Sequence, residues 1–288
     1  MKVSQLIGIL NAIEKGCDAM RTLTMNNGIP IPVLGTGTNT FGKENRVFSA
    51  PINNDTTELK SAIECGYRLI DTAIYYRNES VIGKAVKESG IDRSQFFITS
   101  KIPEKEAFSG TNERVHDSVQ SSLKALDLDY IDLYLIHFPL DTNEDNVRVW
   151  RILEDYVKKG HIRSIGVSNF NIDQLTYLLT HAAIKPVVNQ FLSYPGHHNQ
   201  PLIDFCQAEA IIPEAYQSLT KVAPETKEIL REIGVKYGKT WSQVILNYQI
   251  NEGIIAIPKS HNHAHQADNI DIFDFALSDE DRLRIKHL

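Results

Sequence analysis

Eight short apolar runs alternate with amphipathic stretches along most of the chain, and this alternation constrains the fold more than any other feature of the sequence. The runs are mostly apolar throughout their length, as expected for parallel strands that are buried on both faces. They are Pro32–Gly35, Arg68–Asp71, Phe96–Lys101, Ile131–His137, Ile162–Ser168, Val187–Gln190, Ile211–Tyr216 and Ile254–Pro258. Strands that alternate with helices in this number predict the α/β fold of a parallel (β/α)8 TIM barrel.

The stretches between the runs show the apolar spacing of helices that would cover such a barrel. They are Thr57–Cys65, Glu79–Glu88, Thr111–Leu126, Asn146–Lys159, Ile172–His181, Gln200–Ala208 and Thr226–Tyr237. Trp241–Ile250 and Ser278–Leu288 exceed the simple repeat and predict extra helices, the second with an N-cap at Ser278. A doubly wound open sheet is the alternative, which the absence of a GxGxxG turn after the first run disfavours.

Two more elements are predicted ahead of the barrel. Leu23–Met25 and Ile29–Pro32 flank the sequence Asn-Asn-Gly, a hairpin signal, and we expect this N-terminal β-hairpin to plug the bottom of the barrel. Apolar residues recur near helical spacing between residues 3 and 20, so residues 1–20 are expected to form a helical extension and residues 21–288 a single barrel domain. The extension is open to three interpretations: a packing helix, a dimer contact, or an artefact of an upstream start.

The composition and charge exclude several classes of protein. Hydrophobic residues make up 42% of the 288 residues, and the net charge of −6 argues against a nucleic-acid binder, which would carry a basic stripe. The three cysteines form no ligand-spaced pair, and no apolar run approaches the roughly 20 residues that span a bilayer. We expect a cytoplasmic enzyme without nucleic-acid or membrane partners, and a monomer rather than an oligomer.

Four chemically different side chains follow three consecutive predicted strands. Asp71, Lys101 and His137 are the last polar residues of successive strands, and Tyr76 lies five residues after Asp71. The carboxyl ends of barrel strands meet at one end of the fold, where active sites lie. Each residue alone has an ordinary structural explanation, such as a helix cap or core packing. Their coincidence at corresponding strand ends predicts an active site.

These four groups together can protonate a carbonyl oxygen. A phenol with a pKa near 10 is a poor acid at neutral pH, and an ammonium within about 4 Å favours its anion by roughly 4 kcal/mol at an effective dielectric of 20. We therefore expect Lys101 and Asp71 to lower the pKa of Tyr76, and His137 to aim the carbonyl oxygen at the phenol. No side chain supplies hydride, so a nicotinamide must bring it.

The sequence resembles the aldo-keto reductases over nearly its whole length. The matching blocks are TMNNGIPIPVLGTGT, GYRLIDTAIYYRNESVIG, ITSKI, LDYIDLYLIHFP, GHIRSIGVSNF, VVNQ, IIAIPKS and DFALSDED. The resemblance implies an oxidoreductase that reduces aldehydes and ketones to alcohols by hydride transfer from NADPH. It places Asp71, Tyr76, Lys101 and His137 in the catalytic tetrad, with Tyr76 as the proton donor. The neighbouring Tyr75 is the rival, which we read as a pocket wall because the family's acid stands two residues before Asn-Glu.

The resemblance also implies the cofactor-binding residues. The nicotinamide would be held by Ser168, Asn169, Gln190 and Tyr216, the last of these by stacking. The remaining contacts, to the pyrophosphate, the 2′-phosphate and the adenine, would come from Leu219, Lys259, Ser260, His265, Asp268 and Asn269. The family has an arginine where His265 stands, and a histidine is mostly neutral at pH 7. We therefore expect a weaker preference for NADPH, with NADH able to serve as well.

The substrate cleft departs from the family's pattern. Asn39 and Phe138 stand where the family often has tryptophans, and the loop from Asn39 to Asn54 is longer than usual. The segment after His137 is short, and the chain ends at Leu288 without the usual C-terminal substrate loop. We therefore expect an open, less aromatic cleft that accepts small aldehydes, ketones or α-dicarbonyls.

Three alternatives remain at this point. The first is a non-catalytic nucleotide-binding regulatory subunit on the same scaffold, which would gain nothing from Lys101 beside Tyr76. The second is a hydrolase with paired carboxylates, for which only Asp71 is found. The third is a metal site at His261-x-His263-x-His265, whose spacing matches no common zinc pattern, so no metal is predicted.

Overall fold

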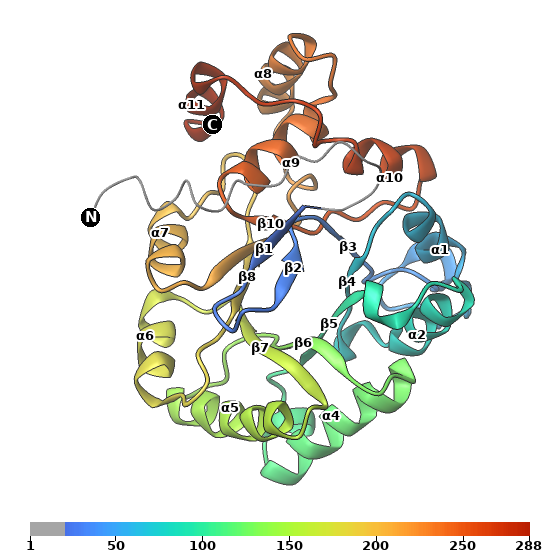
Figure 1. Ribbon diagram of the computed structural model, residues 1–288, viewed down its shortest axis with the longest axis vertical. Coiled ribbons are helices and arrows are strands. Elements are labelled where there is room, and N and C mark those ends of the chain that lie inside the picture. Colours follow the sequence, from blue (N-terminus) through green and yellow to red (C-terminus); the bar gives the residue numbers. More distant parts are fainter. Residues whose placement is uncertain (1–20) are drawn as a thin grey trace.

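Eight parallel strands surrounded by helices form a barrel in the computed structural model, which describes residues 21–288 (Figure 1). The helix expected over residues 3–20 lies outside the described residues. The strands follow one another in the order β3 to β10, and a parallel bridge between Leu34 and Ala256 connects the two ends of the sheet. The strands are β3 (Gly35–Gly37), β4 (Leu69–Asp71), β5 (Phe97–Ile102), β6 (Ile131–Ile136), β7 (Ile162–Ser168), β8 (Val188–Leu192), β9 (Ile212–Tyr216) and β10 (Ile255–Ala256). The predicted (β/α)8 barrel is confirmed.

One predicted strand is wrong in its bounds. Pro32–Gly35 was expected as the first barrel strand, but β3 begins only at Gly35. The preceding residues, Pro30–Pro32, form β2 and pair antiparallel with β1 (Thr22–Thr24). The hairpin therefore takes up Pro32, while Val33 and Leu34 contact Ala256 of β10 and close the barrel.

The helices lie close to their predicted bounds. They are α1 (Thr57–Glu64), α2 (Glu79–Glu88), α3 (Glu106–Ser109), α4 (Asn112–Leu126), α5 (Asn143–Lys158), α6 (Ile172–His181), α7 (Gln200–Ala208), α8 (Pro224–Val235), α9 (Trp241–Asn251), α10 (His263–Ile270) and α11 (Asp279–Lys286). Helix α5 begins three residues earlier than expected because Thr142 caps it, accepting a hydrogen bond from the backbone N–H of Asp145. The short α3 and α10 were not predicted. No helix within residues 21–288 is long and apolar enough to cross a membrane.

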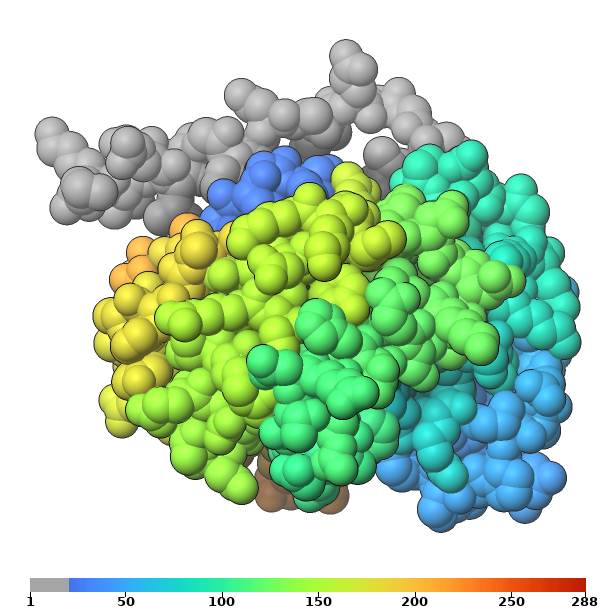
Figure 2. Space-filling model, turned by 90° about the horizontal axis from the view of Figure 1, so that it is seen from below, coloured from blue at the N-terminus to red at the C-terminus, as the bar shows by residue number. Residues whose placement is uncertain are grey.

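The N-terminal hairpin covers the amino-terminal end of the barrel, as predicted. Its turn contains Gly28 in the left-handed region, with φ at 84°. The Asn26 amide donates to the carbonyl oxygens of Pro186 and Ala210, which precede β8 and β9. Met25 packs into the barrel interior. Figure 2 shows the hairpin in dark blue at one end of the molecule and the light-blue segment around residue 50 at the other end.

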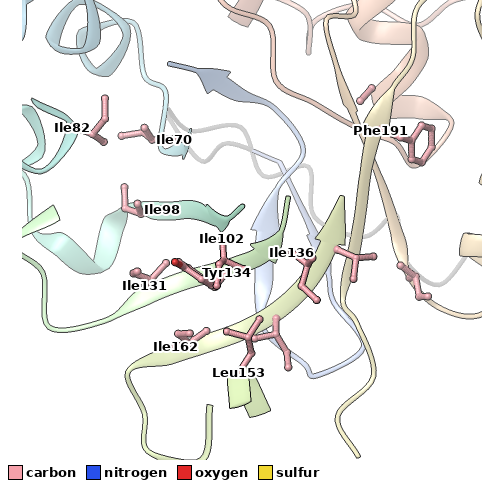
Figure 3. Close-up of a cluster of buried hydrophobic side chains, with 14 of the residues drawn as sticks. Ile70, Ile82, Ile98, Ile102, Ile131, Tyr134, Ile136, Leu153, Ile162 and Phe191 are labelled. Atoms are coloured by element: carbon pink, nitrogen blue, oxygen red, sulfur yellow. The ribbon is translucent and has the colours of Figure 1, made fainter. Parts of the chain in front are cut away.

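Alternate residues of each strand point to opposite faces, and this divides the core into two layers. The outer layer lies between strands and helices, where Ile70 of β4 meets Ile82 of α2 and Ile162 of β7 meets Leu153 of α5 (Figure 3). The inner layer fills the barrel and includes Leu69, Phe97, Leu133, Leu135, Val188, Ile212 and Tyr216. Polar residues two or four positions further along the same strands therefore also point inward, at the carboxyl end.

Candidate active site

The buried ammonium of Lys101 joins the predicted catalytic residues. Its Nζ lies 2.6 Å from the Asp71 carboxylate and 2.9 Å from the carbonyl oxygen of Thr72. The third contact is to the hydroxyl oxygen of Tyr76, at 3.5 Å. Lys101 is 0% exposed and Asp71 only 2% exposed, so the ion pair lies in a medium of low dielectric. Both side chains point into the barrel, because Lys101 stands four residues after the inward-facing Phe97 and Asp71 stands two residues after the inward-facing Leu69.

The turn that carries Tyr76 is held from both sides. A 3₁₀ turn over Ile74–Tyr76 follows β4 and ends at Arg77, which has a left-handed φ of 58°. The buried Asn78 amide then donates to the carbonyl oxygens of Thr38 and Phe41. These bonds tie the turn to the loop after β3 and hold the phenol over Lys101.

The pKa of Tyr76 departs from what the sequence predicted. Burial raises it, the Lys101 ammonium lowers it, and the Asp71 carboxylate raises it, so that the net shift is upward. Lys101 thus lowers this pKa as expected, whereas Asp71 raises it, and the cost of desolvating a phenolate exceeds the attraction of the ammonium. Tyr76 consequently keeps its proton at neutral pH.

His137 is a neutral hydrogen-bonding group. Burial, reinforced by the Lys101 charge, lowers its pKa to about 2. Its ring lies 5.7 Å from that of Tyr76 and stacks on Phe138 at 5.0 Å. Its Nδ1 is buried and has no partner within residues 21–288. A neutral imidazole in this position can donate one hydrogen bond to a substrate oxygen without adding charge to the site.

Tyr75 has a different environment from Tyr76. Its hydroxyl donates to the Glu104 carboxylate at 3.2 Å. Burial and the Glu104 charge raise its pKa to about 12. Among the described residues, the ammonium of Lys101 contacts Tyr76 and not Tyr75, which favours Tyr76 as the acid.

The residues expected to hold the nicotinamide lie together at the ends of β7, β8 and β9. The Tyr216 hydroxyl donates to Asn169 Oδ1 at 2.9 Å, and the Asn169 amide donates to Ser168 Oγ at 2.9 Å. The Gln190 amide donates to Asp71 Oδ2 at 2.9 Å. This last bond connects the expected nicotinamide residues directly to the ion pair between Lys101 and Asp71.

The residues expected to hold the rest of the cofactor are more scattered. Lys259 follows β10 and donates to Asn39 Oδ1 and Thr40 Oγ1, each at 2.8 Å. The Ser260 hydroxyl bonds to the backbone of Asn262, and the Ser260 carbonyl oxygen accepts from the Gln266 amide. The remaining four lie in α10 or in the loop after β9, with His265 and Asp268 exposed, Leu219 partly buried and Asn269 buried. No contact within residues 21–288 joins the His265 imidazole to Lys259.

Three residues next to the site have left-handed backbones without being glycine. Arg77, Asn169 and Gln217 have φ values of 58°, 63° and 58°. They directly follow Tyr76, Ser168 and Tyr216. Such conformations cost of order 1–3 kcal/mol each and concentrate at functional sites, which supports the placement of the site here.

An aromatic ring from the loop after β3, which the sequence did not predict, lies beside Tyr76. The Phe48 ring meets the Tyr76 ring edge-on at 6.2 Å and is 46% exposed. Lys43 and Arg77 hold it in place, because the Lys43 ammonium and an Arg77 N–H both donate to its carbonyl oxygen. This ring adds an aromatic side chain beside Tyr76 that the residues at the family's tryptophan positions did not predict. The unusual length of the loop was the only signal in the sequence.

The second missed residue is Glu214, in the middle of β9. It is 0% exposed, and its Oε1 accepts a hydrogen bond from the same Gln190 nitrogen that bonds to Asp71. Its position in the strand could have revealed it, because a residue two positions before the inward-facing Tyr216 also points inward. The sequence analysis considered only the last polar residue of each strand.

The histidines at 261 and 263 contact different partners. His261 contacts Glu58 and Thr40, whereas the His263 ring contacts Ser61. Within residues 21–288 no group of three His, Cys, Asp or Glu side chains is arranged to hold a metal ion.

The structure defines a (β/α)8-barrel protein in which Tyr76, Lys101, Asp71 and His137 lie together at the carboxyl ends of the strands. The family model described as "Aldo/keto reductase family" matches residues 33–288. The chain belongs to this family and is therefore an oxidoreductase. The hydrolase alternative is wrong.

The relatives agree with this assignment. The chain is 41% identical over 270 residues to the glyoxal reductase of Bacillus subtilis (strain 168), covering 93% of this chain and 92% of the relative. It is 34% identical to the methylglyoxal reductase of Escherichia coli (strain K12), covering 91% and 90%. The crystal structure of an aldo-keto reductase of Bombyx mori in complex with NADP superposes with a TM-score of 0.82 at 35% identity, covering 94% of this chain and 92% of that one.

Proposed function

We propose that this protein reduces small aldehydes and α-dicarbonyls to alcohols with NADPH, and that Tyr76 is its general acid. The observation that carries the proposal is the position of the Lys101 ammonium, 2.6 Å from Asp71 and 3.5 Å from the Tyr76 hydroxyl. An ammonium so placed stabilises a phenolate and has no evident use in a protein that only binds nucleotide.

Each residue of the group has one task. Bound NADPH supplies the hydride that the chain lacks. The neutral imidazole of His137 donates a hydrogen bond to the carbonyl oxygen and holds it near the Tyr76 hydroxyl. Tyr76 transfers its proton to that oxygen as negative charge develops there, and Lys101 stabilises the remaining phenolate. Asp71 keeps Lys101 charged and in position.

The residues at the strand ends fit this cofactor. Ser168, Asn169 and Gln190 present hydroxyl and amide groups for the carboxamide, and the half-buried ring of Tyr216 offers a stacking face. The hydroxyl oxygen of Ser218 is buried without a partner among the described residues, which makes it a free donor for a phosphate oxygen. The other contacts are assigned to Leu219, Lys259, Ser260, His265, Asp268 and Asn269.

The substrate class follows from the relatives and from the cleft. The relatives named above are a glyoxal reductase and a methylglyoxal reductase, whose substrates are small dicarbonyls. Phe48 and Phe138 are exposed beside Tyr76 and His137, so the cleft also presents apolar surface to a bound molecule. We therefore include aromatic aldehydes among the substrates.

A direct assay tests the proposal. Purified protein is mixed with NADPH and either glyoxal, methylglyoxal or 4-nitrobenzaldehyde, and the loss of nicotinamide absorbance is followed. Turnover with these carbonyls is the expected result. Tight NADPH binding by fluorescence quenching without turnover on any of the three would contradict the proposal and favour a non-catalytic regulatory subunit.

Replacing Phe48 by Ala is expected to raise the KM for 4-nitrobenzaldehyde about two- to twelvefold, because an aromatic pair contributes about 0.5–1.5 kcal/mol. The KM for methylglyoxal, which has no ring, should change less than about twofold. Val47→Ala is the matched control, because Val47 is equally exposed at 49% and makes no ring contact with Tyr76. Equal effects on both substrates would show that Phe48 is not a substrate wall.

The exposed imidazole of His265 stands where the family has an arginine for the 2′-phosphate of NADPH. His265→Arg should lower the KM for NADPH, because a guanidinium is always charged and can bind phosphate through two N–H groups. The KM for NADH, which lacks that phosphate, should stay level. An unchanged NADPH KM in His265→Arg would remove His265 from the phosphate site.

A further inference from the structure

Glu214 is a second carboxyl group in the barrel interior, beside the catalytic ion pair. It stands two residues from both Ile212 and Tyr216, which pack in the interior apolar cluster, so its side chain also points into the barrel. The strand registers pair it with Gln190 on β8 and with Ile255 on β10. Its side chain is 0% exposed. No role assigned so far uses this group.

The contacts of Glu214 leave it without a cation of its own. Oε1 accepts from Gln190 Nε2, and the same nitrogen donates to Asp71 Oδ2 at 2.9 Å. Oε2 is buried and has no partner within residues 21–288. The three N–H groups of Lys101 go to Asp71, to Thr72 and to the Tyr76 hydroxyl. One amide nitrogen thus bridges two carboxyl groups, of which only Asp71 has an ion-pair partner.

The charges around Glu214 do not balance if both carboxyl groups are ionised. The groups that face it are Asp71 from β4, Lys101 from β5, Gln190 from β8 and the apolar Ile255 from β10, with Tyr76, Tyr216 and the neutral His137 above them. One cation therefore faces two carboxyl groups. An unpaired buried carboxylate costs several kcal/mol, and burial together with the Asp71 charge raises the pKa of Glu214 to about 8.

We propose that Glu214 is a positioning residue for the proton transfer, which stays protonated at neutral pH and so leaves the charge of Lys101 undivided for the Tyr76 phenolate. This inference rests on the proposed role of Tyr76. When Glu214 ionises, its negative charge competes for Lys101 in the same low-dielectric space, and the phenolate loses part of its stabilisation. Tyr76 then becomes a weaker acid, and carbonyl reduction slows.

The raised pKa of Glu214 also makes the free energy of unfolding depend on pH. The pKa of Glu214 in the folded protein lies above its ordinary value of 4.5, so the folded protein retains a proton that the unfolded chain releases between pH 4.5 and about pH 8. The free energy of unfolding therefore falls as the pH rises through this window and levels off above it. Replacing Glu214 by Gln removes this dependence while keeping the shape of the side chain.

The first experiment compares pH profiles of kcat for carbonyl reduction. We expect wild-type kcat to fall about five- to tenfold between about pH 7 and about pH 9.5, and Glu214→Gln kcat to fall less than about twofold. Lys43→Met is the matched control, because burial and the charges of Arg77 and Lys259 lower the pKa of Lys43 to about 8, in the same window. The proposal requires that Lys43→Met keep the fall. A fall that persists in Glu214→Gln, or disappears in Lys43→Met, would overturn it.

Two further measurements need no turnover and test the protonated carboxyl group separately. Infrared difference spectra of the wild type should show the carbonyl stretch of a protonated buried carboxyl group that disappears near pH 8, and this band should be missing in Glu214→Gln. The difference in Tm between Glu214→Gln and the wild type should grow from about pH 5 to about pH 8 and then stay level. The lack of such a band, or a constant Tm difference, would overturn the proposal even if Tyr76 is the acid. An intact band with a fully active Tyr76→Phe variant would instead contradict the proposed function.

Discussion

Replacing Tyr76 by Phe is expected to lower kcat for methylglyoxal by about 10³-fold, within the range of about 10²–10⁴ for the loss of a general acid. The phenylalanine ring fills the same space, but it has no proton to give and forms no anion for Lys101 to stabilise. NADPH binding should remain near the wild-type value, because the residues proposed to hold the cofactor lie at or just after the ends of β7 to β10 and in α10. Steady-state kinetics and fluorescence titration with NADPH measure the two quantities.

Tyr75→Phe is the matched control for this prediction. It removes a hydroxyl from the adjacent residue and breaks the bond to Glu104, but it leaves the contact between Lys101 and Tyr76 in place. We expect kcat to change less than about threefold in this variant. If Tyr76→Phe merely halves activity while Tyr75→Phe abolishes it, the acid is Tyr75.

Replacing Lys101 by Met should affect both catalysis and stability. Loss of the ammonium removes the stabilisation of the phenolate, and we expect kcat to fall at least about 100-fold. The substitution also leaves the Asp71 carboxylate buried without a cation, and breaking a buried ion pair in this way costs about 3–5 kcal/mol of unfolding free energy. Denaturant unfolding at neutral pH measures the second effect.

The double variant Asp71→Asn with Lys101→Met separates the two effects. Removing both charges eliminates the unpaired carboxylate, so most of the lost unfolding free energy should return. Activity should not return, because no cation then faces Tyr76. A double variant that recovers turnover would contradict the role of Lys101 in stabilising the phenolate.

Much of the candidate site could be predicted because its signals are local. Asp71, Lys101 and His137 end successive apolar strands, and the carboxyl ends of barrel strands meet at one end of the fold. Glu214 was missed because it lies in the middle of a strand, where a polar residue has no such positional meaning. Phe48 was missed because no periodicity describes the loop in which it lies.

The direction in which the pKa of Tyr76 shifts could not be predicted from the sequence, for a different reason. The sequence places an ammonium near a phenol and so predicts a lowered pKa, but it contains no measure of how deeply the phenol is buried. In the structure, burial is the largest influence on this pKa and raises it. Desolvation depends on every group that surrounds the side chain, and these groups come from many segments of the chain.

Local sequence patterns, by themselves, determined the barrel, the hairpin that plugs it and the strand ends at which Asp71 and Lys101 stand. Those features follow from the spacing of residues along a single strand or helix. Only the tertiary structure decided that Glu214 and Asp71 share one amide of Gln190, and that Phe48 lies against Tyr76. These contacts join segments far apart in the sequence, and they exist because the closed barrel directs the inward side chains of different strands into one small, water-poor space.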